Sequence, residues 1–396
     1  MEKDYRDLNP RVRTLMGPGP SNVDPRVLRV MATPLVGHLD PDFLKVMNDT
    51  MELLRYVFGT DNQLTIPMSG TGSAGMETCL VNLLEPGDKI IVGVNGLFGQ
   101  RMCDIGERCG AEVIQVAEEW GKIIQPGAIE DALKANPGVK AVAVVHAETS
   151  TGVCQPLQPV AEVAHRYGAL LIVDTVTSLG GIPVELDEND VDAAFSGTQK
   201  CLSCPPGLSP VSLNERAVEV LQRRESKIRS WYLDLKMISS YWGEERFYHH
   251  TAPINMIYAL REALRIIKEE GLENTFARHE LHGRALARGL EAMGLELLVE
   301  EEYRLPELTA VFAPEGIEEV EVRKALLNEY SLEIGGGLGD LQGKIWRIGL
   351  MGTSCTRKNV TLFLSALENI LAGFSIPVTR GTALAAVEEF YRGRER

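Results

Sequence analysis

No apolar run in the 396 residues is long enough to cross a membrane as a helix, which takes about 17 to 25 residues. The longest runs, at residues 141–145 and 169–173, have the length of buried strands. Positive charge is also in short supply, because 40 lysines and arginines face 55 aspartates and glutamates, for a net charge of -15. Such a chain repels phosphate backbones and anionic lipid headgroups, so we expect neither nucleic acid nor a membrane as a partner.

The sequence also lacks a disulfide framework, since its seven cysteines are an odd number scattered along a long chain. Charges occupy residues 2–4, where a signal peptide would place its apolar region. The last three residues, 394–396, are not the Ser-Lys-Leu address of peroxisomal proteins. These absences favour a cytoplasmic protein.

Hydrophobic residues make up 44% of the chain and charged residues 24%, which is typical of globular proteins, and the length predicts two to three domains. From residue 89 onward, short apolar runs alternate with segments of helical periodicity. Apolar strands separated by helices indicate an α/β fold with a parallel sheet covered on both faces. We predict strands at 89–94, 112–116, 140–145, 169–174, near 193 and at 208–213, and helices at 41–58, 76–84, 100–109, 126–135, 159–167 and 251–270.

Beyond residue 271 the pattern changes to that of a smaller α/β domain. We predict strands at 295–299, 308–312 and 345–348, and helices at 278–293, 320–329, 359–371 and 382–391. The last helix is expected to pack on this small domain. The predicted division is an N-terminal arm at 1–15, a large domain at 16–270 and a small C-terminal domain at 271–396.

Three features are candidates for the carboxyl ends of strands, where ligands bind in parallel sheets. The segment 69–73 (Ser-Gly-Thr-Gly-Ser) precedes a helix, so it is either a capped turn or a phosphate site, but it is not a P-loop. Asp174 ends an apolar strand and could cap the next loop or pair with a protonated pyridine nitrogen. Lys200 lies between small residues and could be a surface charge or form a Schiff base with a cofactor aldehyde.

Each feature alone is a weak signal, but their order, with the lysine about 25 residues after the acid, is typical of enzymes that use pyridoxal 5'-phosphate (PLP). With its longer motifs, the sequence resembles the alanine–glyoxylate and serine–pyruvate aminotransferases, a group of class-V, fold-type-I PLP enzymes. The resemblance covers nearly the whole chain. It rests on the segments at 17–22 (GPGPSN), 95–101 (NGLFGQR), 146–152 (HAETSTG), 196–200 (SGTQK), 248–251 (YHHT), 335–339 (GGGLG) and 347–349 (RIG).

The resemblance implies a mostly parallel seven-stranded sheet in the large domain and a role for several residues. Lys200 would hold PLP and move a proton at the substrate α-carbon, while Asp174 would pair with the pyridine nitrogen. Phe98 would stack on the cofactor ring, where mammalian members carry tryptophan, and Thr149 would reach the side of its phenolic oxygen. Arg347 would clamp the substrate carboxylate through its bidentate fork, although a structural ion pair is the alternative.

The same resemblance implies that the cofactor phosphate is bound by two subunits. Tyr248 and Thr251 would reach it from the partner, so we expect a homodimer with shared active sites. We use the name phosphate cradle for the residues that would bind it from the chain's own side, which are Thr71, Gly72, Ser73 and Gln199.

The implied reaction is a ping-pong transfer of the amino group of a small amino acid, alanine or serine, to a 2-oxo acid, glyoxylate or pyruvate. A related branch uses (S)-ureidoglycine as the donor and glyoxylate as the acceptor. That branch carries glutamine and asparagine where this chain has His38 and Tyr248. We therefore expect alanine or serine, with His38 at the substrate site, and keep ureidoglycine as the alternative.

A second alternative is a cysteine desulfurase-like class-V lyase, which needs a reactive cysteine on a mobile loop. Cys355 follows the expected carboxylate clamp, but the residues after it predict the start of a helix. No metal site is expected, because Cys201-x-x-Cys204 lacks a second pair and residues 249–250 (His-His) lack an acidic residue at ligand-like spacing.

Overall fold

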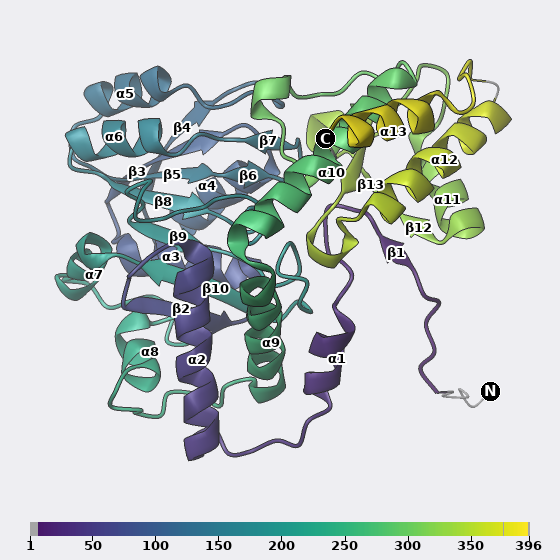
Figure 1. The fold of residues 1–396 in the computed structure, drawn as a ribbon. Helices are drawn as coiled ribbons and strands as arrows, with labels where there is room; N and C mark the ends of the chain where they lie inside the picture. The colour runs from purple at the N-terminus through teal and green to yellow at the C-terminus, as the bar shows by residue number, and fades with distance from the viewer. Residues whose placement is uncertain (1–6, 375, 395–396) are drawn as a thin grey trace, which may run out of the picture.

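A computed structural model describes residues 7–374 and 376–394, with helices packed around a seven-stranded and a three-stranded sheet (Figure 1). The strands are β1 (Thr14–Leu15), β2 (Leu64–Ser69), β3 (Lys89–Val94), β4 (Glu112–Ala117), β5 (Val139–Val145), β6 (Ala147–Glu148), β7 (Val153–Cys154), β8 (Leu170–Asp174), β9 (Ala193–Phe195), β10 (Leu208–Leu213), β11 (Leu308–Phe312), β12 (Leu332–Glu333), β13 (Gly335–Gly336) and β14 (Ile345–Gly349). The α-helices are α1 (Pro25–Met31), α2 (Pro41–Phe58), α3 (Gly72–Leu83), α4 (Leu97–Cys109), α5 (Pro126–Ala135), α6 (Gln158–Arg166), α7 (Glu215–Gln222), α8 (Leu235–Trp242), α9 (Ile254–Glu270), α10 (Leu272–Ala292), α11 (Glu319–Tyr330), α12 (Arg357–Gly373) and α13 (Thr382–Arg394).

The large sheet has the strand order β2-β10-β9-β8-β5-β3-β4. Strands β9, β8, β5, β3 and β4 are parallel, and β10 is antiparallel to both of its neighbours. Every residue of β8 is buried, and because alternate residues face opposite sides, both faces of the sheet are covered there. The predicted α/β fold with a mostly parallel seven-stranded sheet is confirmed.

The carboxyl ends of the parallel strands meet along one edge of this sheet, where ligands bind in α/β folds. The loops that leave this edge contain the residues that the sequence singled out. β2, which runs in the same direction as β9, leads into the phosphate cradle. The last residues of these strands are Ser69 in β2, Val94 in β3, Val145 in β5, Asp174 in β8 and Phe195 in β9.

Helix α2 shows how local sequence sets an element's limits. The Asp40 side chain caps it by accepting a hydrogen bond of 2.8 Å from the backbone N–H of Asp42, and Pro41 occupies the first turn. Gly59 ends it in a left-handed conformation, with φ of 63°. The helix packs along α9 in front of the large sheet in the view of Figure 1.

The three-stranded sheet, β11-β14-β13, is antiparallel and belongs to a second hydrophobic core. Helix α13 packs against α10 and α12, and it buries Ala383, Val387 and Tyr391 in this core, as predicted for the tail helix. Met16 lies in the same core, and the preceding strand β1 pairs with β12. The domain boundaries at residues 15 and 270 stay a prediction.

One predicted element was wrong, and one strand of the large sheet was not predicted. Residues 295–299 do not form a strand, because only Leu297 bridges to Val311 before the chain turns into a 3₁₀ helix at Glu301–Tyr303. Strand β2 was missed because Pro67 in its middle cannot donate a ladder hydrogen bond. Among the described residues β2 pairs only with β10, which makes it an edge strand, where proline is tolerated. No helix within the described ranges is long and apolar enough to cross a membrane.

Candidate active site

Lys200 lies in the turn after β9 and is 7% exposed. Its ammonium group donates a hydrogen bond to the carbonyl oxygen of Pro18. Ser21 fixes the backbone of this turn, because its hydroxyl donates to the carbonyl of Lys200 at 2.7 Å and its N–H donates to the carbonyl of Gln199 at 2.8 Å. Burial lowers the pKa of Lys200 to about 8, and the positive charge of Arg347 adds to the decrease. The Lys200 amine therefore loses its proton more readily near neutral pH than an ordinary lysine does.

The loop that covers Lys200 depends on glycine. Gly19 has a φ of 113°, and a Cβ atom there would lie 2.7 Å from the Lys200 Nζ. An alanine at this position would therefore be strained and would also collide with the lysine. The segment 17–20 thus acts as a close lid over the amine, a contact that the sequence pattern did not reveal.

Asp174 ends β8 and is 2% exposed. One carboxyl oxygen accepts a hydrogen bond of 2.8 Å from the backbone N–H of Val176. Burial raises the pKa of Asp174 to about 7, and the nearby Glu148 carboxyl raises it further, against the positive charge of Lys200. A protonated ring nitrogen placed beside this carboxyl would favour its ionised form.

The phosphate cradle lies at the start of α3. Thr71 is the N-cap residue of α3, and its side chain makes no capping hydrogen bond. Thr71 and Ser73 are exposed, so their hydroxyl groups and the free N–H groups of the helix start are accessible to an anion. The side-chain oxygen Oε1 of Gln199 is buried and has no hydrogen-bond partner within the described residues. A bound polar group at this point would satisfy it.

Gly70, Gly72 and Gly75 also have the Gly-x-Gly-x-x-Gly spacing of dinucleotide-binding loops. In dinucleotide-binding folds the preceding strand lies inside the parallel sheet, whereas β2 is at the edge and its neighbour in the described structure, β10, is antiparallel to it. Gly75 serves close packing instead, because a Cβ atom there would lie 2.1 Å from the Ser209 Oγ. The site therefore does not fit a dinucleotide fold.

Arg347, in β14 of the small sheet, is 5% exposed and reaches across to the large sheet's loops. Its Nη1 donates to the carbonyl of Thr149 at 2.8 Å, and its Nε donates to the carbonyl of Gly336 at 2.7 Å. Arg347 forms no ion pair with any residue that the structure describes, which removes the structural ion pair as an explanation. Burial lowers its pKa to about 10. A buried guanidinium group whose Nη2 has no hydrogen-bond partner among the described residues is suited to a carboxylate ligand.

Phe98 and Thr149 lie on neighbouring loops at the same edge of the sheet. Phe98 is half-buried in the first turn of α4, and Thr149 is buried directly after β6. Glu148, to which the sequence assigned no role, fixes the backbone at Phe98 and at Ser150, the residue after Thr149. Its carboxyl oxygens accept from the Phe98 N–H at 3.1 Å and from the Ser150 hydroxyl at 2.6 Å.

Glu148 is fully buried, and burial raises its pKa, while the donors around it favour the ionised form. Its charge acts on Asp174, Lys200 and Arg347 together. The only sequence signal for it was an acidic residue inside an otherwise apolar and hydroxyl-rich segment at 146–152.

Tyr248, Thr251 and His38 form a separate group on an exposed surface. The Tyr248 ring lies 4.9 Å from the His38 ring, and its hydroxyl is 3.4 Å from the Thr251 Oγ1. Tyr248 is 50% exposed. Neither hydroxyl hydrogen-bonds to the phosphate cradle in the described part of the chain. This arrangement leaves both side chains accessible to a second copy of the chain.

Other polar features do not form sites. Cys201 and Cys204 are buried thiols whose pKa values are raised by burial. No three histidine, cysteine, aspartate or glutamate side chains in residues 7–374 and 376–394 lie close enough to hold a metal ion. His146 is buried, and its Nδ1 has no partner among the described residues.

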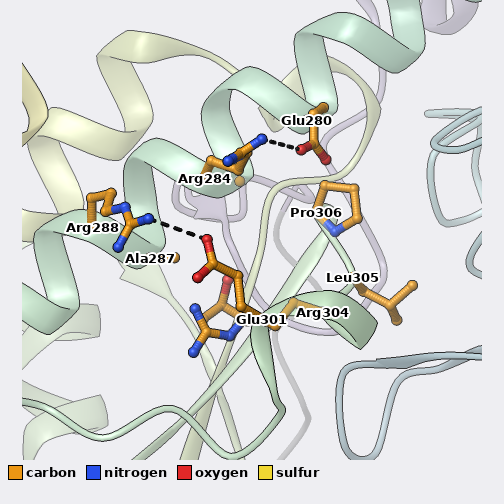
Figure 2. A pocket seen from close by; sticks show the side chains of 10 residues that line it. Glu280, Arg284, Ala287, Arg288, Glu301, Arg304, Leu305 and Pro306 are labelled. Atoms are coloured by element: carbon orange, nitrogen blue, oxygen red, sulfur yellow. Dashed lines mark hydrogen bonds and ion pairs between the residues drawn. The ribbon is translucent and has the colours of Figure 1, made fainter. Parts of the chain in front are cut away.

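Figure 2 shows a different pocket, of about 170 Å³, between α10 and the segment 301–309. Two of its arginines are already ion-paired, Arg284 with Glu280 at 3.3 Å and Arg288 with Glu301 at 3.1 Å. The third, Arg304, pairs with Glu291 at 2.8 Å, so all three arginines of the pocket have acidic partners within the chain. We assign no ligand to this pocket.

The residues at the sheet edge fit PLP chemically. A buried amine, a buried carboxyl, a helix start with free N–H groups and an unpartnered amide oxygen match its aldehyde, ring nitrogen and phosphate. Phe98 offers an aromatic face nearby, and Arg347 offers a cation for a substrate carboxylate. The residues from the large sheet lie at or just after the ends of four strands, β2, β3, β8 and β9, so their placement depends on how the whole sheet is assembled.

The profile of the family described as aminotransferase class-V matches residues 20–341. The (S)-ureidoglycine–glyoxylate transaminase of Bacillus subtilis is 43% identical over 410 residues, covering 99% of this chain and 98% of that protein. The alanine–glyoxylate aminotransferase of Callithrix jacchus is 41% identical, over 92% of this chain and 89% of that protein. The crystal structure of an alanine–glyoxylate aminotransferase from Nostoc sp. has a TM-score of 0.91 to this structure, with 50% identity over 93% of this chain and 98% of that one.

Proposed function

The chain belongs to the class-V aminotransferase family, and we propose that it transfers the amino group of alanine or serine to glyoxylate, with PLP held at Lys200. The observation that carries the proposal is the buried set of Lys200, Asp174 and Arg347 at one edge of the large sheet, with no ion pair from Arg347 to any described residue. The amine could form the Schiff base with PLP, the acid could pair with its ring nitrogen, and the guanidinium group could bind a substrate carboxylate. Pyruvate is a further candidate acceptor.

PLP supplies an electron sink that stabilises negative charge at the substrate α-carbon. Asp174 would hold the proton on the ring nitrogen, because the negative carboxylate favours the protonated form of a neighbouring base. Phe98 would stack on the ring, and Thr149 would lie beside the phenolic oxygen. The phosphate cradle would bind the phosphate through hydroxyl, amide and backbone N–H groups.

Lys200 would act as the base and acid of the reaction. Its pKa of about 8 leaves an appreciable fraction of the free amine at neutral pH, so the Nζ can take a proton from the substrate α-carbon and return it. The lid formed by residues 17–20 would exclude water from this amine, which favours the neutral form. Arg347 would orient the substrate by binding its carboxylate with two parallel hydrogen bonds.

The identity of the amino donor depends on His38 and Tyr248. Their rings contact each other at 4.9 Å and present aromatic surfaces rather than the two amide side chains expected for binding a ureido group. This favours alanine or serine. Ureidoglycine is kept as the second candidate because the B. subtilis relative is similar over nearly the whole of both chains.

A cysteine desulfurase-like activity is not favoured. Cys355 is fully buried, its Sγ lies 3.6 Å from the carbonyl oxygen of Arg278, and burial raises its pKa to about 12. A thiol in that state is protonated and inaccessible, whereas sulfur transfer needs a reactive thiolate.

The donor is tested by the visible absorption of the purified holoenzyme. We expect alanine or serine alone to bleach the band of bound PLP and glyoxylate to restore it. If ureidoglycine bleached the band much faster than either, the donor assignment would be wrong and the second candidate would replace it. If no donor bleached it, the transaminase proposal itself would fail.

The proposed active unit is a homodimer in which Tyr248 and Thr251 reach the partner's phosphate cradle. The segments that carry His38 and Tyr248 expose several large apolar side chains, as surfaces that pair with another protein often do. These are Leu28, Leu35, Leu39, Trp231, Phe247 and Tyr248, each between 44% and 73% exposed. Light scattering on the PLP-loaded protein should give twice the chain mass of 43.5 kDa, and a PLP-loaded monomer would contradict the proposal.

A cytoplasmic location is part of the proposal. All seven cysteines are free thiols and six of them are buried, as is usual for proteins of a reducing compartment. Fractionation of the source cells with an antibody against the chain would test this, and recovery in an oxidising compartment would contradict it.

A further inference from the structure

The residues of the phosphate cradle carry no positive charge that could balance the negative charge of a phosphate. A phosphate monoester carries about -1.5 to -2 at neutral pH. The groups proposed to bind it, including those from the partner, are hydroxyls, an amide and backbone N–H groups, none of which carries a full charge. The start of α3 contributes only about half a positive charge. A partly buried dianion therefore needs a positively charged side chain, and the phosphate-binding residues expected from the sequence do not include one.

Arg101 is placed to supply that cation. It lies on α4 one turn after Phe98, and its guanidinium carbon is 4.9 Å from the centre of the Phe98 ring. Its Nη1 donates to the Ser73 Oγ at 3.3 Å, so it connects α4 to the first turn of α3. The guanidinium group thus contacts both a cradle residue and the expected ring-stacking residue.

Arg101 has no acidic partner among the residues that the structure describes, although acidic residues outnumber basic ones by 55 to 40 in this chain. Arg108, two turns further along the same helix, shows the usual arrangement, since it pairs with Asp104 at 2.9 Å. The positive charge of Arg101 also lowers the pKa of Asp174, which indicates that its field reaches the active site.

The other titratable groups near the cradle do not replace Arg101. His250 lies 3.0 Å from the Ser69 Oγ, but burial and the neighbouring His249 lower its pKa, so it is neutral at physiological pH. Lys200 is committed to the cofactor aldehyde in the proposed function. Asp174 is negative or neutral and cannot balance an anion.

We propose that Arg101 is a cofactor-binding residue that pairs with the phosphate of PLP beside Ser73, while its planar group also packs on Phe98. This inference rests on the proposed position of the phosphate at the start of α3. In this arrangement one side chain couples two contacts, because the guanidinium group holds the phosphate and restrains the ring that stacks on the cofactor.

The test compares PLP with pyridoxal, which lacks only the phosphate. Dissociation constants for both are measured by absorbance and tryptophan fluorescence on the apo forms of the parent, Arg101→Met and Arg101→Lys. Arg108→Met serves as the matched control on the same helix. We expect Arg101→Met to weaken PLP binding about ten- to hundredfold and to leave pyridoxal binding unchanged, with partial recovery in Arg101→Lys.

Competition by inorganic phosphate gives a second readout. We expect phosphate to slow the reloading of the parent and Arg108→Met apoenzymes with PLP, and to have little effect on Arg101→Met. Equal weakening of PLP and pyridoxal would overturn the proposal, because it would mean that Arg101 only supports Phe98. Unchanged PLP binding in Arg101→Met would also overturn it. If the parent did not prefer PLP over pyridoxal, the position of the phosphate itself, and with it the proposed function, would be wrong.

Discussion

Replacing Glu307 with glutamine is expected to stabilise the protein near neutral pH. Glu307 lies directly before β11, and both of its carboxyl oxygens are buried without a partner in the described residues. Its surroundings are small or apolar: a Cβ atom on Gly181 would lie 3.2 Å from its Oε1, and Cys201 lies beside the same glycine. Burial raises the pKa of Glu307 to about 8 from an ordinary value of 4.5.

The sign and size of the effect follow from these two pKa values. Because the folded pKa is the higher one, the stability contributed by protonated Glu307 is complete below about pH 4.5 and is lost as the pH rises toward about 8. Each pH unit in this window costs about 1.4 kcal/mol. Glutamine has nearly the same shape and no charge, so Glu307→Gln should gain about 3 kcal/mol over the parent between about pH 5 and pH 7.5, and nothing more above about pH 8.5.

The assay is urea unfolding of PLP-loaded parent and variant, followed by tryptophan fluorescence across this pH range. Glu302→Gln, which changes an exposed carboxyl in the same segment, is the control and should show no such trend. A stability difference that is the same at low and high pH would refute the reasoning. So would a variant that is less stable than the parent at about pH 8.

Two further changes test the substrate site and its support. Arg347→Met removes the group proposed to bind the substrate carboxylate, so kcat/KM for the amino donor should fall about 100-fold, mainly through a higher KM. The absorption band of bound PLP should remain. An unchanged KM would argue against this role of Arg347. Glu148→Gln turns one accepting oxygen into an NH₂ group, which must face either the N–H of Phe98 on the Oε2 side or the N–H and hydroxyl of Ser150 on the Oε1 side. The unfolding free energy should therefore fall by about 2 kcal/mol, and PLP should bind several-fold more weakly in equilibrium titration. A variant with unchanged stability and unchanged PLP binding would contradict this role of Glu148.

Much of the fold could be predicted because its signals are local. β3 and β10 have the predicted bounds, and α2 has its own cap, proline and terminal glycine. The missed strand β2 contains Pro67, and its pairing to β10 joins residues far apart in the sequence. The short segment at 295–299 has the pattern of a strand but meets β11 at a single bridge. Whether such a segment forms a strand is decided by its neighbours and not by its own residues.

Local sequence also predicts some residues of the candidate site and not others. Asp174 and Lys200 could be singled out because Asp174 ends an apolar strand and Lys200 lies in the turn after another. Their partners could not, since Lys200 and Pro18 are 182 residues apart and Arg347 and Thr149 are 198 residues apart. Glu148 and Arg101 lay within segments used for the resemblance, yet their roles depend on helix α4 meeting α3 and β6, which only the structure reveals.

The central claim is that Lys200 is the residue that holds PLP, and reduction of the holoenzyme with sodium borohydride followed by peptide mass mapping tests it most directly. Reduction makes a lysine–cofactor linkage permanent, so the modified residue can be identified. We predict a single cofactor-modified lysine, at position 200, and no such peptide from a Lys200→Ala variant that remains folded. Modification of another lysine, or of none in a protein that absorbs as a PLP enzyme, would contradict the account.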